Sequence, residues 1–263
     1  MQRSRPVVTG ASGRIGRMLR AVWGAQGADW RSRADGPPLA RLPRGGTLLC
    51  LAGVVPGAGE MSENAVIARE TVAAAEAAGM HRVLLVSSAA VYPAGAGLTE
   101  ADAAPANAYG HAKLAMESVT SDIVETCALR LGNVAGADAL LSRLGADAPV
   151  LHVWPDGRAP RRSYVGPRSL ARILAALAGH PGPLPRILNV AAPGAVGMDA
   201  LLAAAGRDWT PLPAPPGAVP VVEMDVRRLA ALVPLDAAEG SAQEIVRQWR
   251  AVHDDRGGPG GRQ

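Results

Sequence analysis

The sequence predicts a doubly wound α/β fold, in which helices cover both faces of a parallel sheet. Short apolar runs alternate with stretches of helical periodicity, which favours parallel strands joined by crossover helices. The first apolar run leads at once into a glycine-rich turn and a helical pattern. A later run over residues 82–88 is apolar up to Ser87 and Ser88, as expected for a buried parallel strand that delivers hydroxyls to its carboxyl end.

The first predicted unit is a strand, a turn and a helix. Residues 7–9 are strand-like, and apolar residues after position 14 recur on one side of a helix. Glycines in such a turn let backbone N–H groups at the helix start approach a pyrophosphate, where the helix dipole also favours negative charge. The spacing G-x-x-G-x-x-G in this context predicts a dinucleotide site. We expect contacts from Thr9, Gly10, Ser12, Gly13, Arg14, Ile15 and Gly16.

The following elements extend the same alternation. Residues 27–35 hold a second strand that is short and polar, and residues 47–52 form a third strand-like run. Helices are predicted over 63–78, ending at Gly79, and over 109–121. After Asn133 the pattern is broken by Pro149, Pro155, Pro160 and Pro167. We therefore expect a core over 1–133, a small C-terminal substrate-binding region interleaved with remaining core elements over 134–253, and a disordered tail over 254–263.

Lys113 is the only lysine among the 27 Lys and Arg residues, and it stands four positions after Tyr109. Positions i and i+4 share one face of a helix, so the compact ammonium would lie near the phenol and favour its ionised form. The pair is typical of a proton-transfer site. The same short pattern also arises by chance on surface helices.

Three motifs in this order resemble the extended short-chain dehydrogenase/reductase family, in particular its NAD-dependent epimerase/dehydratase group: Thr9-Gly-x-x-Gly-x-x-Gly16, Ser87-Ser88-Ala-Ala-Val-Tyr92 and Tyr109-Gly-x-x-Lys113. Similar segments span about residues 5 to 250. The resemblance implies a Rossmann-type fold, with Tyr109 as general acid/base, Lys113 as its electrostatic partner and ribose ligand, and Ser88 as a hydrogen-bond donor to the reacting oxygen. Ser87 is expected to point elsewhere, because side chains alternate along a strand. The expected cofactor contacts also include Leu51, Ala52 and Gly53, and the expected substrate contacts are Asn133, Arg161 and Arg162.

Cofactor choice depends on the end of the second strand, where an acidic residue is typical of NAD binding and a basic residue of NADP binding. Arg31 and Arg33 favour NADP. NAD stays possible, because Asp35 could bind the ribose and both arginines could be solvated.

Charge and aromatic content argue against a nucleic-acid partner. The net charge is +4, but aromatic residues make up only 3% and phenylalanine is absent. Four arginines, at 158, 161, 162 and 168, could hold the diphosphate of a nucleotide-sugar or be ordinary solvated charge.

Membrane spans, a signal peptide and metal clusters are not expected. No run is long and apolar enough to cross a bilayer, so the cytoplasm is the expected compartment. Cys50 and Cys127 lie in apolar strand-like runs, which predicts buried free thiols. The five histidines are scattered singly, which predicts no metal site.

The predicted function is hydride transfer at a hydroxyl or carbonyl carbon of a nucleotide-sugar or, since the substrate region is short, a smaller carbonyl compound. Dehydration is least favoured, because Ala89 and Ala90 occupy the position where dehydratases carry acidic residues. The alternative is a non-catalytic NADP-binding redox sensor or partner-binding protein. The resemblance also implies a homodimer joined through the Tyr109 helix, where small residues would allow close approach: Ala108, Gly110, Ala112 and Ala115.

Overall fold

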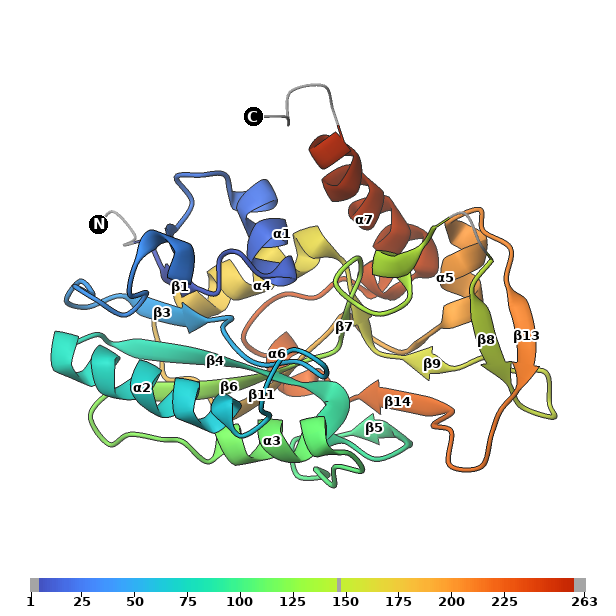
Figure 1. Ribbon diagram of the computed structural model, residues 1–263, viewed down its shortest axis with the longest axis horizontal. Helices are drawn as coiled ribbons and strands as arrows, with labels where there is room; N and C mark the ends of the chain where they lie inside the picture. The colour runs from blue at the N-terminus through green and yellow to red at the C-terminus, as the bar shows by residue number, and fades with distance from the viewer. Residues whose placement is uncertain (1–4, 146–147, 258–263) are drawn as a thin grey trace.

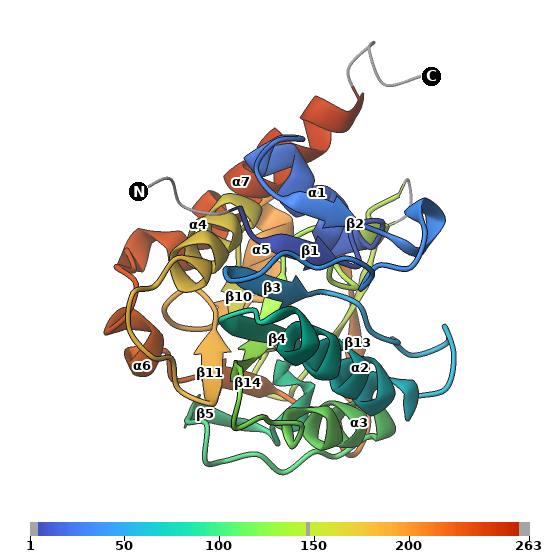
Figure 2. The same cartoon turned by 90° about the vertical axis from the view of Figure 1, so that its left-hand side faces the viewer.

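The computed structural model describes residues 5–145 and 148–257. Its centre is a sheet of six parallel strands in the order β11-β6-β4-β3-β1-β2. Figure 2 shows β2, β1, β3 and β4 following one another from top to bottom. This confirms the predicted doubly wound α/β class. The strands are β1 (Val7–Thr9), β2 (Asp29–Arg31), β3 (Thr47–Cys50), β4 (Arg82–Ser88), β6 (Glu125–Leu131) and β11 (Ile187–Val190).

Helices cover both faces of this sheet (Figure 1). Helices α1 (Arg14–Trp23), α4 (Pro167–Ala178) and α7 (Ala242–Gly257) lie on one face, and α2 (Glu63–Ala78) and α3 (Ala108–Glu117) on the other. Alternation along the strands explains the two cores, since Val8, Leu49 and Leu84 pack with the first group while Val7, Leu48 and Leu85 pack with the second.

Two predicted elements end earlier than expected. Helix α2 has the predicted bounds, but α3 stops at Glu117, because the Ser121 side chain accepts hydrogen bonds from the N–H groups of Ile123 and Val124 and closes a turn instead. The strand predicted over 47–52 ends at Cys50, which leaves Leu51 and Ala52 in the following loop.

Strand order reverses between β1 and β3, which is the switch point where ligands bind in such sheets. In the described residues β2 is the edge strand on this side. The segment after it forms only the 3-10 turn η1 (Arg33–Asp35), and the prolines at 37, 38 and 43 keep it out of regular structure. After this segment the chain enters β3 without an intervening helix.

A smaller region lies beyond the carboxyl ends of the sheet strands, and the arrow of β3 points toward it (Figure 1). It is not a contiguous stretch of sequence, because β5 from the first half of the chain pairs with β14, while β11, α4 and α7 belong to the large sheet layer. Its elements, with the connecting 3-10 turns, are β5 (Gly95–Leu98), β7 (Asn133–Val134), β8 (Val150–Val153), β9 (Arg161–Arg162), β10 (Tyr164–Val165), β12 (Val196–Gly197), α5 (Met198–Ala204), β13 (Thr210–Pro213), β14 (Val221–Met224), η2 (Ala89–Val91), η3 (Leu141–Arg143) and η4 (Ala237–Gly240). Helix α6 (Arg227–Ala230) instead packs against β11, and its Leu229 belongs to the core of the large layer.

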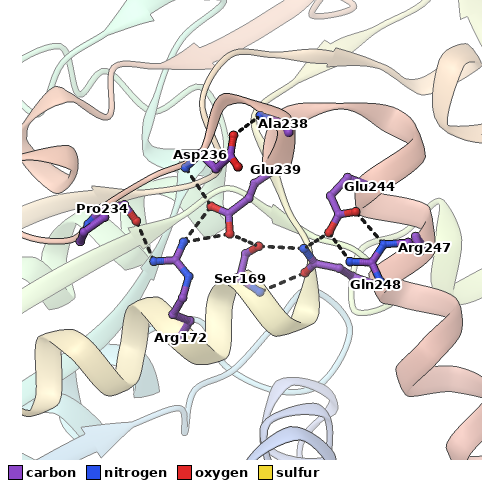
Figure 3. A network of polar contacts seen from close by, with 9 residues as sticks. All are labelled: Ser169, Arg172, Pro234, Asp236, Ala238, Glu239, Glu244, Arg247 and Gln248. Atoms are coloured by element: carbon purple, nitrogen blue, oxygen red, sulfur yellow. Dashed lines mark hydrogen bonds and ion pairs between the residues drawn. The ribbon is translucent and has the colours of Figure 1, made fainter.

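The C-terminal helix α7 is tied to α4 by a set of polar side chains that we call the α4–α7 network (Figure 3). Helix α7 continues through Gly257, so residues 254–257, which were predicted to begin a disordered tail, are helical; residues 258–263 lie outside the described residues. The network consists of Ser169, Arg172, Glu239, Glu244, Arg247 and Gln248.

Both cysteines are free and buried, as predicted. Burial raises the pKa of the Cys127 thiol to about 12. None of the helices described here combines the length and apolar character needed to cross a bilayer.

Candidate active site

A cavity of about 520 Å³ opens at the carboxyl edge of the sheet, between the glycine-rich turn and the smaller region. Most of its lining comes from positions that the sequence analysis assigned to cofactor, catalysis or substrate. The predicted residues that line it are Gly10, Gly13, Arg14, Ile15, Gly16, Leu51, Gly53, Ser88, Tyr109 and Asn133.

The glycines of the turn are there because neighbouring backbone is too close for a side chain. Gly10 has φ +76°, and a Cβ built on it would lie 2.6 Å from the Ala52 nitrogen. A Cβ on Gly16 would lie 2.5 Å from the Gly10 oxygen, so Gly16 lets α1 start against the turn. The result is a cradle of bare backbone at a helix start, which fits a dinucleotide pyrophosphate. Thr9 and Ala52 stand behind this cradle, and the Thr9 hydroxyl is buried without a hydrogen-bond partner among the described residues.

Tyr109 reaches the cavity because α3 begins directly beneath it. Asn107 caps the helix by accepting a hydrogen bond from the Gly110 N–H at 2.9 Å. Gly110 itself lies against the Ala90 carbonyl, with which any Cβ would overlap. Gly110 therefore serves packing within the chain, and it does not offer the helix–helix surface that the sequence predicted for it.

Tyr109 and Ser88 both lie at the cavity wall, and the Ser88 hydroxyl accepts a hydrogen bond from the Ala90 N–H at 3.1 Å. The sequence predicted that Lys113 lowers the pKa of Tyr109, but the structure contradicts this for the protein alone. Burial of the phenol raises its pKa, and the hydrogen bond with Ser88 only partly opposes that rise. The reason is geometric: the Lys113 ammonium lies over the ring, 5.9 Å from its centroid.

Lys113 lies just behind the cavity wall and is only 5% exposed. Its Nζ donates a hydrogen bond to the Val86 carbonyl at 3.0 Å, and a Cβ on Gly53 would lie 3.1 Å from it. Burial lowers the pKa of Lys113, and the nearby Cys50 and Glu117 oppose this. Gly53 lines the cavity, and because it has no side chain, only its backbone lies between the Lys113 ammonium and the cavity.

The two arginines at the second strand differ in their surroundings. Arg31 donates to Asp29 Oδ2 at 2.7 and 3.0 Å and to the carbonyl of Ala40 at 2.6 Å, so its guanidinium is already held. Arg33 is exposed on η1. Ser32, between them, donates to Asp35 Oδ2 at 2.5 Å. Ser12 and both arginines lie outside the lining of the main cavity.

The substrate side holds Asn133 at the cavity but not the predicted arginines. Arg161 donates to the Ala195 carbonyl, and Arg162 donates to the carbonyls of Val219 and Pro220. Arg158 pairs with Asp156, and Arg168 lies near Glu244. The four arginines therefore have separate partners.

Sequence reasoning missed Asp138, which lines the cavity beside Asn133. Its carboxylate accepts N–H bonds from Gly136 at 3.1 Å and Leu140 at 3.1 Å and the Tyr164 hydroxyl at 2.8 Å, while burial raises its pKa. These bonds make a turn around Asp138, and the sequence signal for that turn was an aspartate that closely follows a strand and a glycine. Val55, Ala137 and Ala139 also line the cavity and were missed.

A buried ion pair between Glu117 and Arg130, which was not predicted from the sequence, joins the end of α3 to β6. Arg130 interrupts the apolar run of β6, and Glu117 stands four residues after Lys113. A charge in a buried strand needs a partner, so this pattern could have predicted the pair.

The sequence model described as "NAD dependent epimerase/dehydratase family" matches residues 54–191, more than half of the 263-residue chain. The comparison with curated proteins found no match.

Several solved structures share the fold. A short-chain dehydrogenase/reductase superfamily protein from Agrobacterium tumefaciens with bound NAD is 20% identical, with a TM-score of 0.72 over 95% of this chain and 97% of that one. An NAD-dependent NDP-hexosamine 5,6-dehydratase involved in tunicamycin biosynthesis is 21% identical, with a TM-score of 0.74 over 96% and 98%. A UDP-N-acetylglucosamine 4-epimerase from Methanobrevibacter ruminantium, in complex with UDP-N-acetylmuramic acid, is 18% identical, with a TM-score of 0.73 over 96% and 100%.

Proposed function

The chain belongs to the NAD-dependent epimerase/dehydratase family, and we propose that it is an NADP-dependent oxidoreductase or epimerase of that family. It moves hydride to or from a carbon that bears a hydroxyl or carbonyl group in a nucleotide-sugar or a smaller carbonyl compound. The observation that carries the proposal is the convergence of Ser88, Tyr109 and Lys113 from β4 and α3 beside a glycine-lined cavity.

Each of the three side chains has a chemical role in this proposal. Tyr109 takes or supplies the hydroxyl proton at its phenolic oxygen, and Ser88 donates a hydrogen bond to the same substrate oxygen. The nicotinamide, when bound, supplies or accepts the hydride. Lys113 holds the ribose from beside Gly53, where no side chain fills the space next to its ammonium. A protein that only sensed dinucleotides would need the glycine cradle but not this trio.

The preference for NADP rests on Arg33 rather than Arg31. Arg33 is exposed just past the end of β2, where it can meet a 2′-phosphate, whereas Arg31 is held by Asp29 and loop carbonyls. One of the similar solved structures has NAD bound and another is described as an NAD-dependent dehydratase, so NADP preference is a specific claim about this chain.

A calorimetric titration tests the cofactor claim. A charge-assisted contact contributes about 1.5–3 kcal/mol, so NADPH should bind roughly tenfold or more tightly than NADH. Arg33→Ala should remove that difference, while Arg20→Ala, an exposed arginine within α1, serves as the matched control. Equal affinities in the wild-type protein would reject NADP preference and leave NAD as the cofactor.

Two substrate classes are proposed, a nucleotide-sugar and a smaller carbonyl compound. Asn133 at the cavity and Arg162, which lies outside the cavity lining, are the candidate contacts to a nucleotide-sugar, the kind of ligand present in the similar epimerase structure. Arg162 now donates to three backbone carbonyls and would have to release them to bind a diphosphate. Turnover can be measured by nicotinamide absorbance with a panel of nucleotide-sugars and of small hydroxy and carbonyl compounds. The compounds that are turned over show which of the two substrate classes is correct.

Turnover should depend on the catalytic trio. Tyr109→Phe should abolish hydride transfer and leave cofactor binding nearly intact, because only the proton-transfer group is lost. Lys113→Arg should fail despite its charge, because the planar guanidinium is too broad for the space beside Gly53. Activity retained by Tyr109→Phe would reject the catalytic role.

We also propose a homodimer that uses the outer face of α3. Ala108, His111 and Ala115 are exposed there. A monomer in light scattering at micromolar concentration would reject it. The proposed compartment is the cytoplasm, which suits two free thiols.

A further inference from the structure

A group of three buried polar side chains lies directly behind the catalytic residues, and we call it the α3 anchor: Ser87, Glu117 and Arg130. The Arg130 and Glu117 side chains are only 1% and 2% exposed. Arg130 Nη2 donates to Glu117 Oε2 at 2.7 Å, and its Nε lies 3.0 Å from Oε1. Ser87 Oγ donates to Oε1 at 2.5 Å, so its hydroxyl is bonded to Glu117, while Ser87 also forms part of the cavity lining together with Ser88.

The anchor joins the neighbouring strands β4 and β6 to the last turn of helix α3. Ser87 on β4 and Arg130 on β6 are directly paired in the sheet, so both side chains face α3. Glu117 is one turn beyond Lys113 on the same side of α3. Lys113 bonds to the carbonyl of Val86, and Glu117 bonds to the side chain of Ser87. Two successive residues of β4 therefore hold two successive turns of α3, and the next residue of the strand is Ser88.

We propose that Glu117 is a positioning residue, which through Ser87 and Arg130 fixes α3 against β4 and so holds Lys113 and Tyr109 at the correct distance from Ser88. This inference rests on the proposed function, because it explains how the proposed catalytic trio is kept in place. It goes beyond that function because Glu117 touches neither cavity nor ligand.

The anchor also continues toward the substrate side. Arg130 Nη1 donates to the Tyr92 hydroxyl at 2.9 Å and to the Glu100 carbonyl at 2.8 Å. Tyr92 in turn donates to Asn189 at 2.6 Å. The same guanidinium thus fixes α3 and the loop that follows the catalytic serine strand.

The Glu117 carboxylate provides a negative charge near Lys113, which apolar packing could not. A well-packed apolar pair of similar volume often supports a fold equally well. It would not place a negative charge one turn from the buried Lys113. The other titratable groups facing that ammonium are Tyr109 on its own helix and Cys50 at the end of β3, while the packed helix α2 contributes the uncharged Asn64.

The single lysine of the chain provides a test that needs no substrate. Protein produced with isotope-labelled lysine gives one side-chain resonance, and that resonance belongs to Lys113. Its pH titration reports the ionisation of Lys113 directly. In the wild type we expect a pKa below the ordinary lysine value, because burial outweighs Glu117 and Cys50.

The variants then separate positioning from folding. In Glu117→Gln the Lys113 pKa should fall further, because an opposing charge is lost. The matched control is Glu239→Gln, which removes the carboxylate partner of Arg172 on the opposite face of the sheet and should leave the resonance unchanged. An unchanged pKa in folded Glu117→Gln would overturn the proposal.

Ser87→Ala decides the question if Glu117→Gln does not fold, because it keeps the ion pair and removes only the bond to β4. The Lys113 resonance should shift, and NADPH affinity should fall roughly tenfold, as expected for a lost hydrogen bond to a charged group. Wild-type resonance and affinity in this variant would overturn the proposal. If the wild-type protein itself binds neither NADPH nor NADH, the proposed function fails instead.

Discussion

The α3 anchor and the α4–α7 network use similar side chains in different surroundings. Each centres on an arginine–glutamate pair with Arg Nη2 at 2.7 Å from a carboxylate oxygen and a serine alongside. The pair in the anchor is 1% and 2% exposed, whereas Arg172 and Glu239 of the α4–α7 network are 42% and 16% exposed. Buried charges have no water to replace a lost partner, so the anchor must stay complete while the other network need not.

The largest effect should come from breaking the anchor. Arg130→Met leaves the Glu117 carboxylate buried with Ser87 alone, which should cost about 3–5 kcal/mol of unfolding free energy. Urea denaturation measures it. The double variant Arg130→Met with Glu117→Leu should recover most of the loss, because no charge is left unpaired. A loss below about 1 kcal/mol in the single variant would place the anchor in the same class as a surface pair.

An intermediate effect should come from the buried, uncharged part of the α4–α7 network. Gln248 is 4% exposed and accepts a hydrogen bond from the Ser169 N–H at 3.0 Å. Gln248→Met removes that acceptor and leaves the N–H buried, which should cost about 1–3 kcal/mol. The same denaturation experiment checks it, and a loss equal to that of Arg130→Met would show that burial rather than charge sets the difference.

The smallest stability effect should come from the exposed pair. Arg172→Met should cost about 0–1 kcal/mol and become smaller at high salt, because water can solvate Glu239 once the arginine is gone. Denaturation at low and high salt tests this. A loss of several kcal/mol that salt does not reduce would contradict the comparison.

The pH dependence of stability should reveal the cost of keeping Lys113 buried. Burial lowers the folded-state pKa of Lys113, so between that value and the ordinary lysine value the unfolded chain binds more protons. Stability contributed by this position should therefore rise with pH through that window and be lowest below it. Comparing the wild type with Lys113→Met from neutral to alkaline pH isolates the term, and a wild-type curve that falls relative to the variant would contradict the sign.

The sequence predicted the elements whose pattern is local. The strand, turn and helix over residues 7–23 follow from glycines and apolar spacing, and helix α2 follows from its terminal Gly79. The end of α3 was placed too late, because a turn made by the Ser121 hydroxyl stops the helix while its apolar pattern continues.

Contacts between distant segments were not predictable in the same way. Asp138 meets Tyr164, and Glu117 meets Arg130, only because the topology brings separate strands and helices together. Arg31 was predicted to favour NADP, yet residues two apart on a strand share one face, and Arg31 pairs there with Asp29. The pKa of Tyr109 depended on burial, which a short motif does not encode.

The most direct test of the proposed active site follows the single lysine resonance during titration with NADPH. If Lys113 contacts the cofactor ribose beside Gly53, the resonance should shift saturably, at the same NADPH concentrations that calorimetry reports for binding. Tyr109→Phe should retain that shift, because the phenol is not needed to hold the ribose. Saturable NADPH binding that leaves the Lys113 resonance unmoved would contradict the assignment of this cavity as the cofactor and catalytic site.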